Sequence, residues 1–238
     1  PQRRRDAWGV PPRLCVSAVI DFQIFKFSNC IRLFNFHIST FPHFHIPSFR
    51  IFTPMTLPIH RLHRIAVSIF FFCCGCIFAT WASRIPSIKD KFHFNEASLG
   101  AVLFMLPFGS LVALPFAGWS VARFGSRTMT FLSAVLYAVL LVMLGYTDNV
   151  TALATVLFFF GFWGDVLNIA VNTQALQVQE EHYSKPLMSS FHGMWSLGAL
   201  SGAFFGGLFM KAKWEMMSQF LFVAIVITLM VVFFFFYL

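Results

Sequence analysis

Charged side chains are scarce in this sequence, and acidic ones are the scarcest. Only 11% of its 238 residues are charged, with 17 Lys and Arg against 9 Asp and Glu, whereas soluble domains carry about 25% charged residues. Hydrophobic residues make up 58% of the chain, and the mean hydropathy is +0.74. This composition excludes an ordinary soluble domain and indicates a membrane protein.

Signatures of common enzymes and metal sites are also missing. The sequence has no P-loop, no HExxH, no GxSxG and no GxGxxG after a strand pattern. Of its 5 cysteines, three lie in the stretch CCGC at 73–76, which supplies no further metal ligand. Free cysteine behaves as a small hydrophobe, so we interpret these thiols as buried and inert. We expect no metal, no cofactor and no enzymatic activity.

Six apolar runs follow residue 64, and each is long enough to cross a bilayer. A spanning helix needs about 20 largely apolar residues, because the bilayer core offers its backbone no water to bond. The runs cover about 65–83, 98–120, 129–147, 150–176, 189–210 and 217–237. Nearly all charges beyond residue 83 fall between them, and Asp165 is the exception. We therefore predict an all-α, polytopic membrane protein, a bundle of six transmembrane helices.

Residues 1–54 follow a different pattern. They are basic and rich in Phe, as in FNFHISTFPHFHIPSFRIF, and contain neither a 20-residue apolar run nor a secretory signal. We expect this leader to be disordered or not native, with Met55 as the first residue of the protein and 55–238 as its membrane domain. From residue 55 onward, the Lys and Arg of the connecting segments are shared equally between the two sides, and the upstream basic residues favour an inside N-terminus.

The fourth run carries three polar residues on one face. In GFWGDVLNIAVNTQA, residues 161–175, Asp165, Asn168 and Asn172 are spaced i, i+3 and i+7, which places them within a sector of roughly 60°. A carboxylate at the centre of a spanning helix costs about 2.5–3.5 kcal/mol and is a functional candidate by default. Two interpretations stay open: the stripe lines a cavity in which Asp165 exchanges a proton, or it bonds a neighbouring helix. We favour the cavity.

The fifth run, MSSFHGMWSLGALSGAFFGG, combines small residues with polar ones. Its glycines recur every fourth residue, a spacing that lets another helix approach closely, at Gly198, Gly202 and Gly206. His192 is either an ordinary interfacial histidine or a proton-relay or gating group. A membrane enzyme using His192 with Ser189 or Ser190 is a weaker alternative, because no third group orients the base.

A short motif, GWSVARFGSR at 118–127, carries a resemblance. With the preceding residues from 78 it resembles the first two helices and following loop of Major Facilitator Superfamily (MFS) transporters, whose loop signature is G-x-x-x-D-R-x-G-x-R/K. The matching residues are Gly118, Arg123, Gly125 and Arg127. The resemblance implies that Arg123 and Arg127 belong to an inner gate. Ala122 replaces the acid with which the family latches its two halves.

A second resemblance covers residues 165–202. DVLNIAVNTQALQVQ followed by PLMSSFHGMWSLGALSGA is similar to helices four and five of a bacterial inner-membrane branch, the YbjJ-like or fucose-permease-like transporters. Their pattern L-D-V-A-M-N-x-Q-A sets Asn168 at a common aspartate position and aligns Asn172 and Gln174 with their counterparts. Asp165 then lies one helical turn from the usual acid. The candidates for binding solute or proton are thus Asp165, Asn168, Asn172, Gln174 and His192.

These resemblances imply the N-terminal six-helix half of a two-half fold, with the solute site between the halves. We expect secondary active transport of a small polar solute, such as a sugar, with proton coupling, in the bacterial inner membrane. A second half or a second copy would complete the cavity, and we expect a truncated transporter. The alternative is a membrane protein that does not transport, either a pseudogene product or a regulatory half. The expected partners are solute and lipid, not nucleic acid.

Overall fold

The computed structural model describes residues 59–183 and 185–238, so the leader expected at 1–54 lies outside the described part. Within that part the chain forms eight helices and no strand. They are α2 (Ile59–Ser83), α3 (Ile85–Phe92), α4 (Glu96–Leu103), α5 (Met105–Phe124), α6 (Ser126–Gly145), α7 (Val150–His182), α8 (Met188–Lys211) and α9 (Met216–Phe235).

These helices make six segments that are long and apolar enough to span a membrane. Helices α2 and α3 together form the first, α4 and α5 together form the second, and each later helix forms one. The predicted all-α class and the six predicted spans are therefore confirmed. The bounds differ most at the end of the first span, which α3 extends to Phe92, and at two further helix ends, since α2 begins at Ile59 and α7 continues to His182. All three extensions contain charged or polar residues, and a helix can continue into water because its backbone bonds are internal.

Local chemistry fixes the turns between the spans. Asn95 and Asn149 cap helices α4 and α7, accepting hydrogen bonds from Ser98 N (2.8 Å) and Ala152 N (2.7 Å). At the opposite end Gly125 alone joins α5 to α6, with a φ of 85° that favours glycine. We call the two ends of the bundle the Asn95 end and the Gly125 end.

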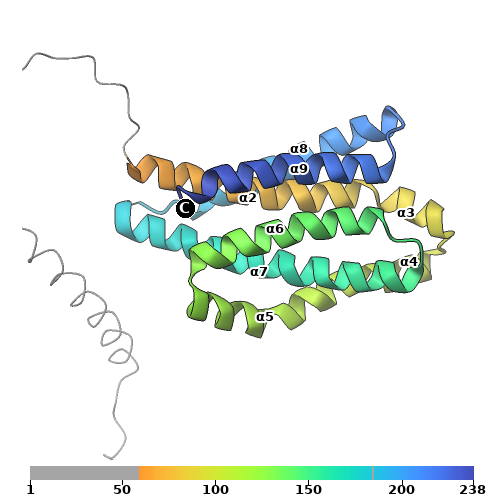
Figure 1. Ribbon diagram of the computed structural model, residues 1–238, viewed down its shortest axis with the longest axis horizontal. Coiled ribbons are helices and arrows are strands. Elements are labelled where there is room, and N and C mark those ends of the chain that lie inside the picture. The colour runs from red at the N-terminus through yellow and green to blue at the C-terminus, as the bar shows by residue number, and fades with distance from the viewer. Residues whose placement is uncertain (1–58, 184) are drawn as a thin grey trace, which may run out of the picture. The chain divides into compact units, whose positions relative to one another are not determined.

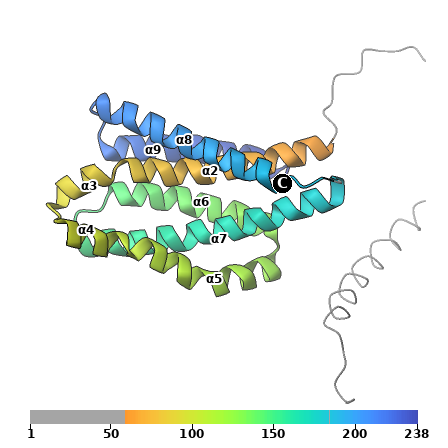
Figure 2. The ribbon, with the colours of Figure 1, turned by 180° about the vertical axis from the view of Figure 1, so that it is seen from behind.

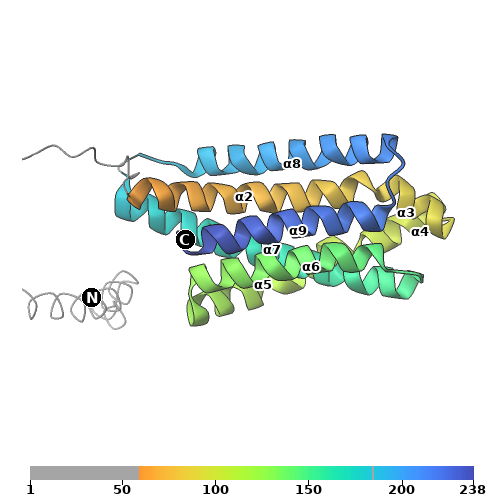
Figure 3. The same cartoon turned by 45° about the horizontal axis from the view of Figure 1, so that its top comes forward.

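The helices divide into two groups. Helices α2, α8 and α9 lie on one side of the bundle, and α5, α6 and α7 on the other (Figure 1). From behind, α8 runs along α2 while α7 crosses beside α5 (Figure 2). Helix α8 lies at the outer edge, in contact mainly with α2 (Figure 3). The largest helix contacts are α2 with α8 and α5 with α7. In order along the chain, the first pair joins spans one and five, and the second joins spans two and four. If spans one to three are exchanged with spans four to six, each pair becomes the other, as expected for a fold built from two inverted repeats.

Both of these pairs rest on backbone contact at glycine. A Cβ on Gly198 of α8 would overlap the Phe72 carbonyl group of α2. A Cβ on Gly161 of α7 would overlap the Leu106 carbonyl group in the first turn of α5. Gly202 and Gly206 continue the first contact against α2. The predicted small-residue ridge of α8 therefore lies against α2. The equivalent close contact at Gly161 of α7 was not predicted from the sequence.

The extension of α7 ends in an aromatic cluster at the Gly125 end. The His182 ring stacks on His63 of α2, with 5.7 Å between ring centroids. Tyr183 donates from its hydroxyl to the His60 carbonyl oxygen over 3.2 Å, and the Arg64 guanidinium lies over the Tyr183 ring. The beginning of α2 and the end of α7 are thus joined outside the apolar runs.

Candidate functional site

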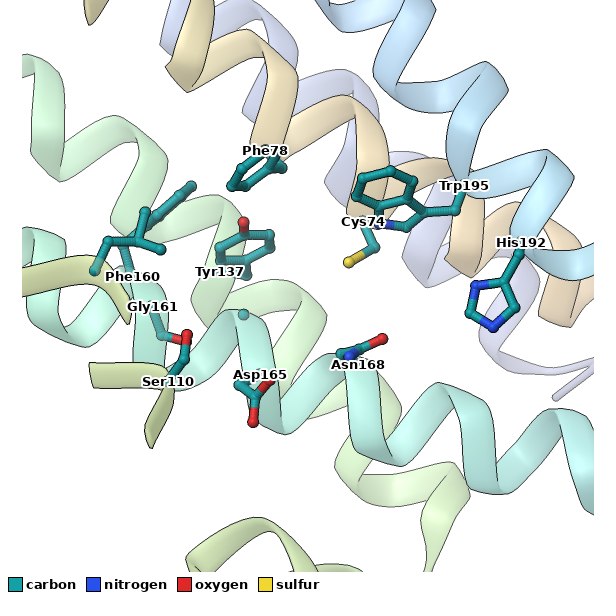
Figure 4. A pocket seen from close by; sticks show the side chains of 12 residues that line it. Cys74, Phe78, Ser110, Tyr137, Phe160, Gly161, Asp165, Asn168, His192 and Trp195 are labelled. Atoms are coloured by element: carbon teal, nitrogen blue, oxygen red, sulfur yellow. The ribbon is translucent and has the colours of Figure 1, made fainter. Parts of the chain in front are cut away.

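A cavity of about 370 Å³ lies between the two groups of helices, in the size range of small-molecule sites. Its lining comes from five helices, α2, α5, α6, α7 and α8, and from no single sequence segment. Figure 4 shows the labelled side chains converging on it. Lining residues are Cys74, Phe78, Leu106, Ser110, Tyr137, Phe160, Gly161, Gly164, Asp165, Asn168, His192 and Trp195.

Helix α7 supplies the carboxylate and the amide of this cavity. Asp165 is half-buried and Asn168 is exposed, and both line the cavity from the face predicted by their spacing. Asp165 Oδ2 is buried and has no hydrogen-bond partner among residues 59–183 and 185–238. A buried carboxylate oxygen without a donor is costly, so it requires a proton or a donor from a ligand.

Asn172, the third member of the stripe, does not line the cavity. Its Nδ2 donates to the Asn168 carbonyl oxygen over 2.7 Å and to Asn168 Oδ1 over 2.9 Å. This bond uses one acceptor site of the Asn168 amide oxygen, and the NH₂ group of Asn168 can still donate to a ligand. Asn172 therefore positions Asn168 from one turn away.

Three further polar side chains line the cavity from other helices. Ser110 of α5 donates to the Gly161 carbonyl oxygen over 3.1 Å, which fixes its hydroxyl against α7. Tyr137 of α6 is buried, and its ring lies beside Gly164 of α7. His192 of α8 is exposed and meets the Phe71 ring edge to face, with centroids 5.5 Å apart. The structure thus brings His192 to the same cavity as Asp165 and Asn168.

Aromatic side chains form most of the remaining wall. They are Phe78 of α2, Tyr137 of α6, Phe160 of α7 and Trp195 of α8. The Tyr137 and Phe160 ring centroids lie 4.3 Å apart, and those of Phe78 and Trp195 lie 6.3 Å apart. Sequence reasoning missed all four, because each lies in an apolar run where an aromatic residue carries no distinguishing signal.

Gln174 lies on the opposite face of α7 from Asp165 and away from the cavity. It is buried, and its Oε1 lies 2.6 Å from the Ser126 hydroxyl at the start of α6. Gln177 Oε1 lies 2.7 Å from the same hydroxyl. This cluster joins α7 to the beginning of α6 at the Gly125 end and is separate from the lining residues.

The signature residues of the 118–127 motif gather at the Gly125 end rather than at the cavity. Arg127 donates to the Phe235 carbonyl oxygen of α9 over 3.1 Å, and its guanidinium lies 5.0 Å from the centre of the Phe235 ring. Arg123 and Gly118 are exposed on α5. A Cβ on Gly118 would meet no atom within 4 Å, so packing within the described helices does not explain this glycine.

Metal ligands do not gather in the described residues. No group of three His, Cys, Asp or Glu side chains there could hold a metal ion. Cys73, Cys74 and Cys76 are free thiols, and Cys15 and Cys30 lie outside the described range. The cavity can therefore act through hydrogen bonds, charge and aromatic surface.

Six apolar helices, long enough to span a bilayer, are those of a multi-pass membrane protein. The chain belongs to the Major Facilitator Superfamily, whose sequence profile matches residues 66–238. This places it in a family of membrane transporters that handle small molecules.

Three curated relatives are similar to the chain, and two of them are named as transporters. The chain is 38% identical over 129 residues, 54% of its length, to the uncharacterized transporter y4wD of Sinorhizobium fredii, and this covers 34% of that protein. It is 33% identical over 147 residues, 62% of its length, to the membrane protein MosC of Rhizobium meliloti, covering 36% of MosC. An uncharacterized MFS-type transporter of Yersinia pestis is 31% identical over 140 residues, 59% of this chain and 36% of that protein. The chain thus matches about a third of the length of these relatives.

Proposed function

We propose that this chain forms one six-helix half of a secondary active transporter and that a small polar solute binds in the cavity beside Asp165. The observation that carries the proposal is the buried Oδ2 atom of Asp165, which has no partner in the described residues although it lies in a membrane span. Retaining such a group for packing alone is unfavourable, since hydrogen bonds between spanning helices average about 0.6 kcal/mol. A cavity that alternately takes up proton and solute accounts for it.

Proton coupling would run through Asp165. Its carboxylate would carry a proton when the cavity is dry and release it when the cavity opens to water or binds solute. Asn168, positioned by Asn172, would donate to the solute. His192 would stand at the open side as a second proton acceptor. A second six-helix half, from a longer chain or a second copy, would close the cavity.

The resemblance to the YbjJ-like branch suggests a sugar as the solute and the bacterial inner membrane as the location. Asn168 and the Ser110 hydroxyl suit solute hydroxyl groups, and aromatic walls suit a ring. Ala122 favours a second candidate function, a membrane protein that regulates or has lost transport, because this position lacks the acid of the family's latch.

Vesicles containing the purified chain, in which two copies can pair to close the cavity, test this proposal. With a pH gradient across the membrane, addition of sugars to one side should move protons, as read by a pH-sensitive dye inside the vesicles. Asp165→Asn should abolish this movement because the amide cannot take up a proton, while the amount of inserted protein is unchanged. Asp90→Asn is the matched control, since it removes an exposed carboxylate outside the cavity. A chain that moves no proton or solute would support the second candidate, and normal movement in Asp165→Asn would remove Asp165 from the mechanism.

A further inference from the structure

The cavity has an unbalanced charge. Asp165 is the only Asp, Glu, Lys or Arg among the described residues that line it, so no permanently charged cation neutralises the carboxylate there. The other titratable groups that face the cavity are His192, Tyr137 and Cys74, from α8, α6 and α2. A carboxylate in surroundings of low dielectric constant strongly favours a nearby positive charge.

Aromatic side chains line the same cavity as the carboxylate. Phe78, Tyr137, Phe160 and Trp195 all line the cavity, and their faces carry partial negative charge. Cations bind over such faces within about 6 Å of the ring centre, most strongly over Trp. The walls and the carboxylate therefore favour the same ligand charge, and both disfavour an anion.

From this pairing we infer that the solute is a cation, a small molecule with a protonated amine on a ring or a short apolar body. The inference rests on the proposed function and refines its substrate class. The ammonium group would donate to the Asp165 carboxylate, while the Asn168 amide would donate to an oxygen elsewhere on the solute. A neutral sugar could offer hydroxyl donors, but it would leave the carboxylate charge unbalanced. An ammonium supplies the donor and the charge together.

Three sugars that differ in charge on one ring form a matched set of probes: glucosamine as its protonated amine, glucose, and glucuronate. Binding to the purified chain in lipid nanodiscs can be followed by calorimetry. We expect glucosamine to bind about tenfold more tightly than glucose, because hydrogen bonds to charged groups are stronger than neutral ones. Glucuronate should bind more weakly than glucose.

Two variants assign this preference to the cavity. Asp165→Asn should reduce glucosamine binding to the level of glucose and leave glucose binding unchanged, because the amide keeps the shape and loses the charge. Asp90→Asn should preserve the preference. Circular dichroism and size-exclusion profiles identical to the unsubstituted chain exclude misfolding as the cause.

The outcomes separate this inference from the proposed function. If glucose binds as tightly as glucosamine, the cationic substrate class is wrong. If Asp165→Asn keeps the preference, the inference that the Asp165 carboxylate selects the cation is wrong. Proton-linked entry of glucose into vesicles in either case would leave the proposed transporter standing. If none of the three sugars binds and none enters vesicles, both the transport proposal and the cationic class are overturned.

Discussion

Arg84 is a buried cation held by neutral groups. It lies at the Asn95 end with 5% of its surface exposed, and its Nε donates to Gln219 Oε1 over 2.6 Å. Its Nη2 donates to the Trp214 carbonyl oxygen over 2.8 Å. Gln219 is fully buried, and its Nε2 has no partner among the described residues. The Arg84 guanidinium therefore connects the end of α2 to α9 and to the segment between α8 and α9 by hydrogen bonds.

Substitution of Gln219 tests the contribution of its hydrogen bond with Arg84 to stability. Gln219→Leu should lower the stability of the purified chain by about 1.5–3 kcal/mol, the usual contribution of a hydrogen bond to a charged group. Gln219→Glu should keep the stability within about 1 kcal/mol of that of the unsubstituted chain. The new carboxylate still accepts from Arg84, and the NH₂ group without a partner is no longer present. Thermal unfolding in detergent measures both. A Gln219→Leu chain as stable as the original would show that the bond contributes nothing.

The cavity was only partly predictable from single residues. Asp165 and Asn168 were placed together by their spacing, since helix geometry decides which side chains share a face. Gln174 was a candidate through resemblance alone, and it is nine residues from Asp165, half a turn out of phase, so it faces α6. Trp195 and Phe78 could not be found, because their convergence depends on how α2 and α8 pack and not on either segment.

At the scale of helices, the predicted spans were the most reliable result. Length and hydropathy located all six, because the bilayer imposes both on any spanning helix. Bounds were less accurate where the apolar run ends before the helix does. In α7 the residues after Leu176 are polar but still helical, and Gln179 Oε1 accepts from Leu187 N over 2.6 Å in the next connection. Hydropathy could not detect this part of the helix.

The contact of α2 with α8 yields a prediction for glycine. Gly198→Ala should destabilise the chain by about 1–3 kcal/mol, because the new methyl group overlaps the Phe72 carbonyl group and forces the helices apart. Gly207→Ala in the same helix is the matched control, since its Cβ would meet no atom within 4 Å. That change should be neutral or stabilising by up to about 1 kcal/mol through helix propensity. Equal melting temperatures for the two variants would contradict the close contact.

For the whole molecule, six spans place alternate connections on opposite sides of the membrane. The turn at Gly125 shares one end with Tyr183 and Lys185, while Asp148 lies at the Asn95 end. At the Asn95 end the basic residues Lys89 and Lys91 pair with Glu96 and Asp148, which explains part of the even distribution of positive charge. The orientation therefore needs a direct measurement.

Introduced cysteines provide that measurement. In intact cells a membrane-impermeant maleimide should label Asp148→Cys and not Lys185→Cys, because we expect the Gly125 end to face the cytoplasm. Permeabilised cells should label both, and the unsubstituted chain gives the background. Loss of the Lys91 pair in Asp148→Cys should matter little, since exposed ion pairs contribute about 0–1 kcal/mol. Labelling of both sites in intact cells would rule out the six-span topology, and the reverse pattern would invert the orientation.

Helix α7 extends unequally to the two sides of its contact with α5. At 1.5 Å per residue, its part from Gly161 to His182 is about 30 Å long, and its part from Val150 to Gly161 is about 17 Å. The backbone of α7 contacts α5 at Gly161, so a tilt of α7 would rotate it about this contact. A rigid tilt of α7 around it displaces His182 almost twice as far as Val150. Small movements beside Asp165 would thus be magnified at the Gly125 end, where His182 stacks on His63.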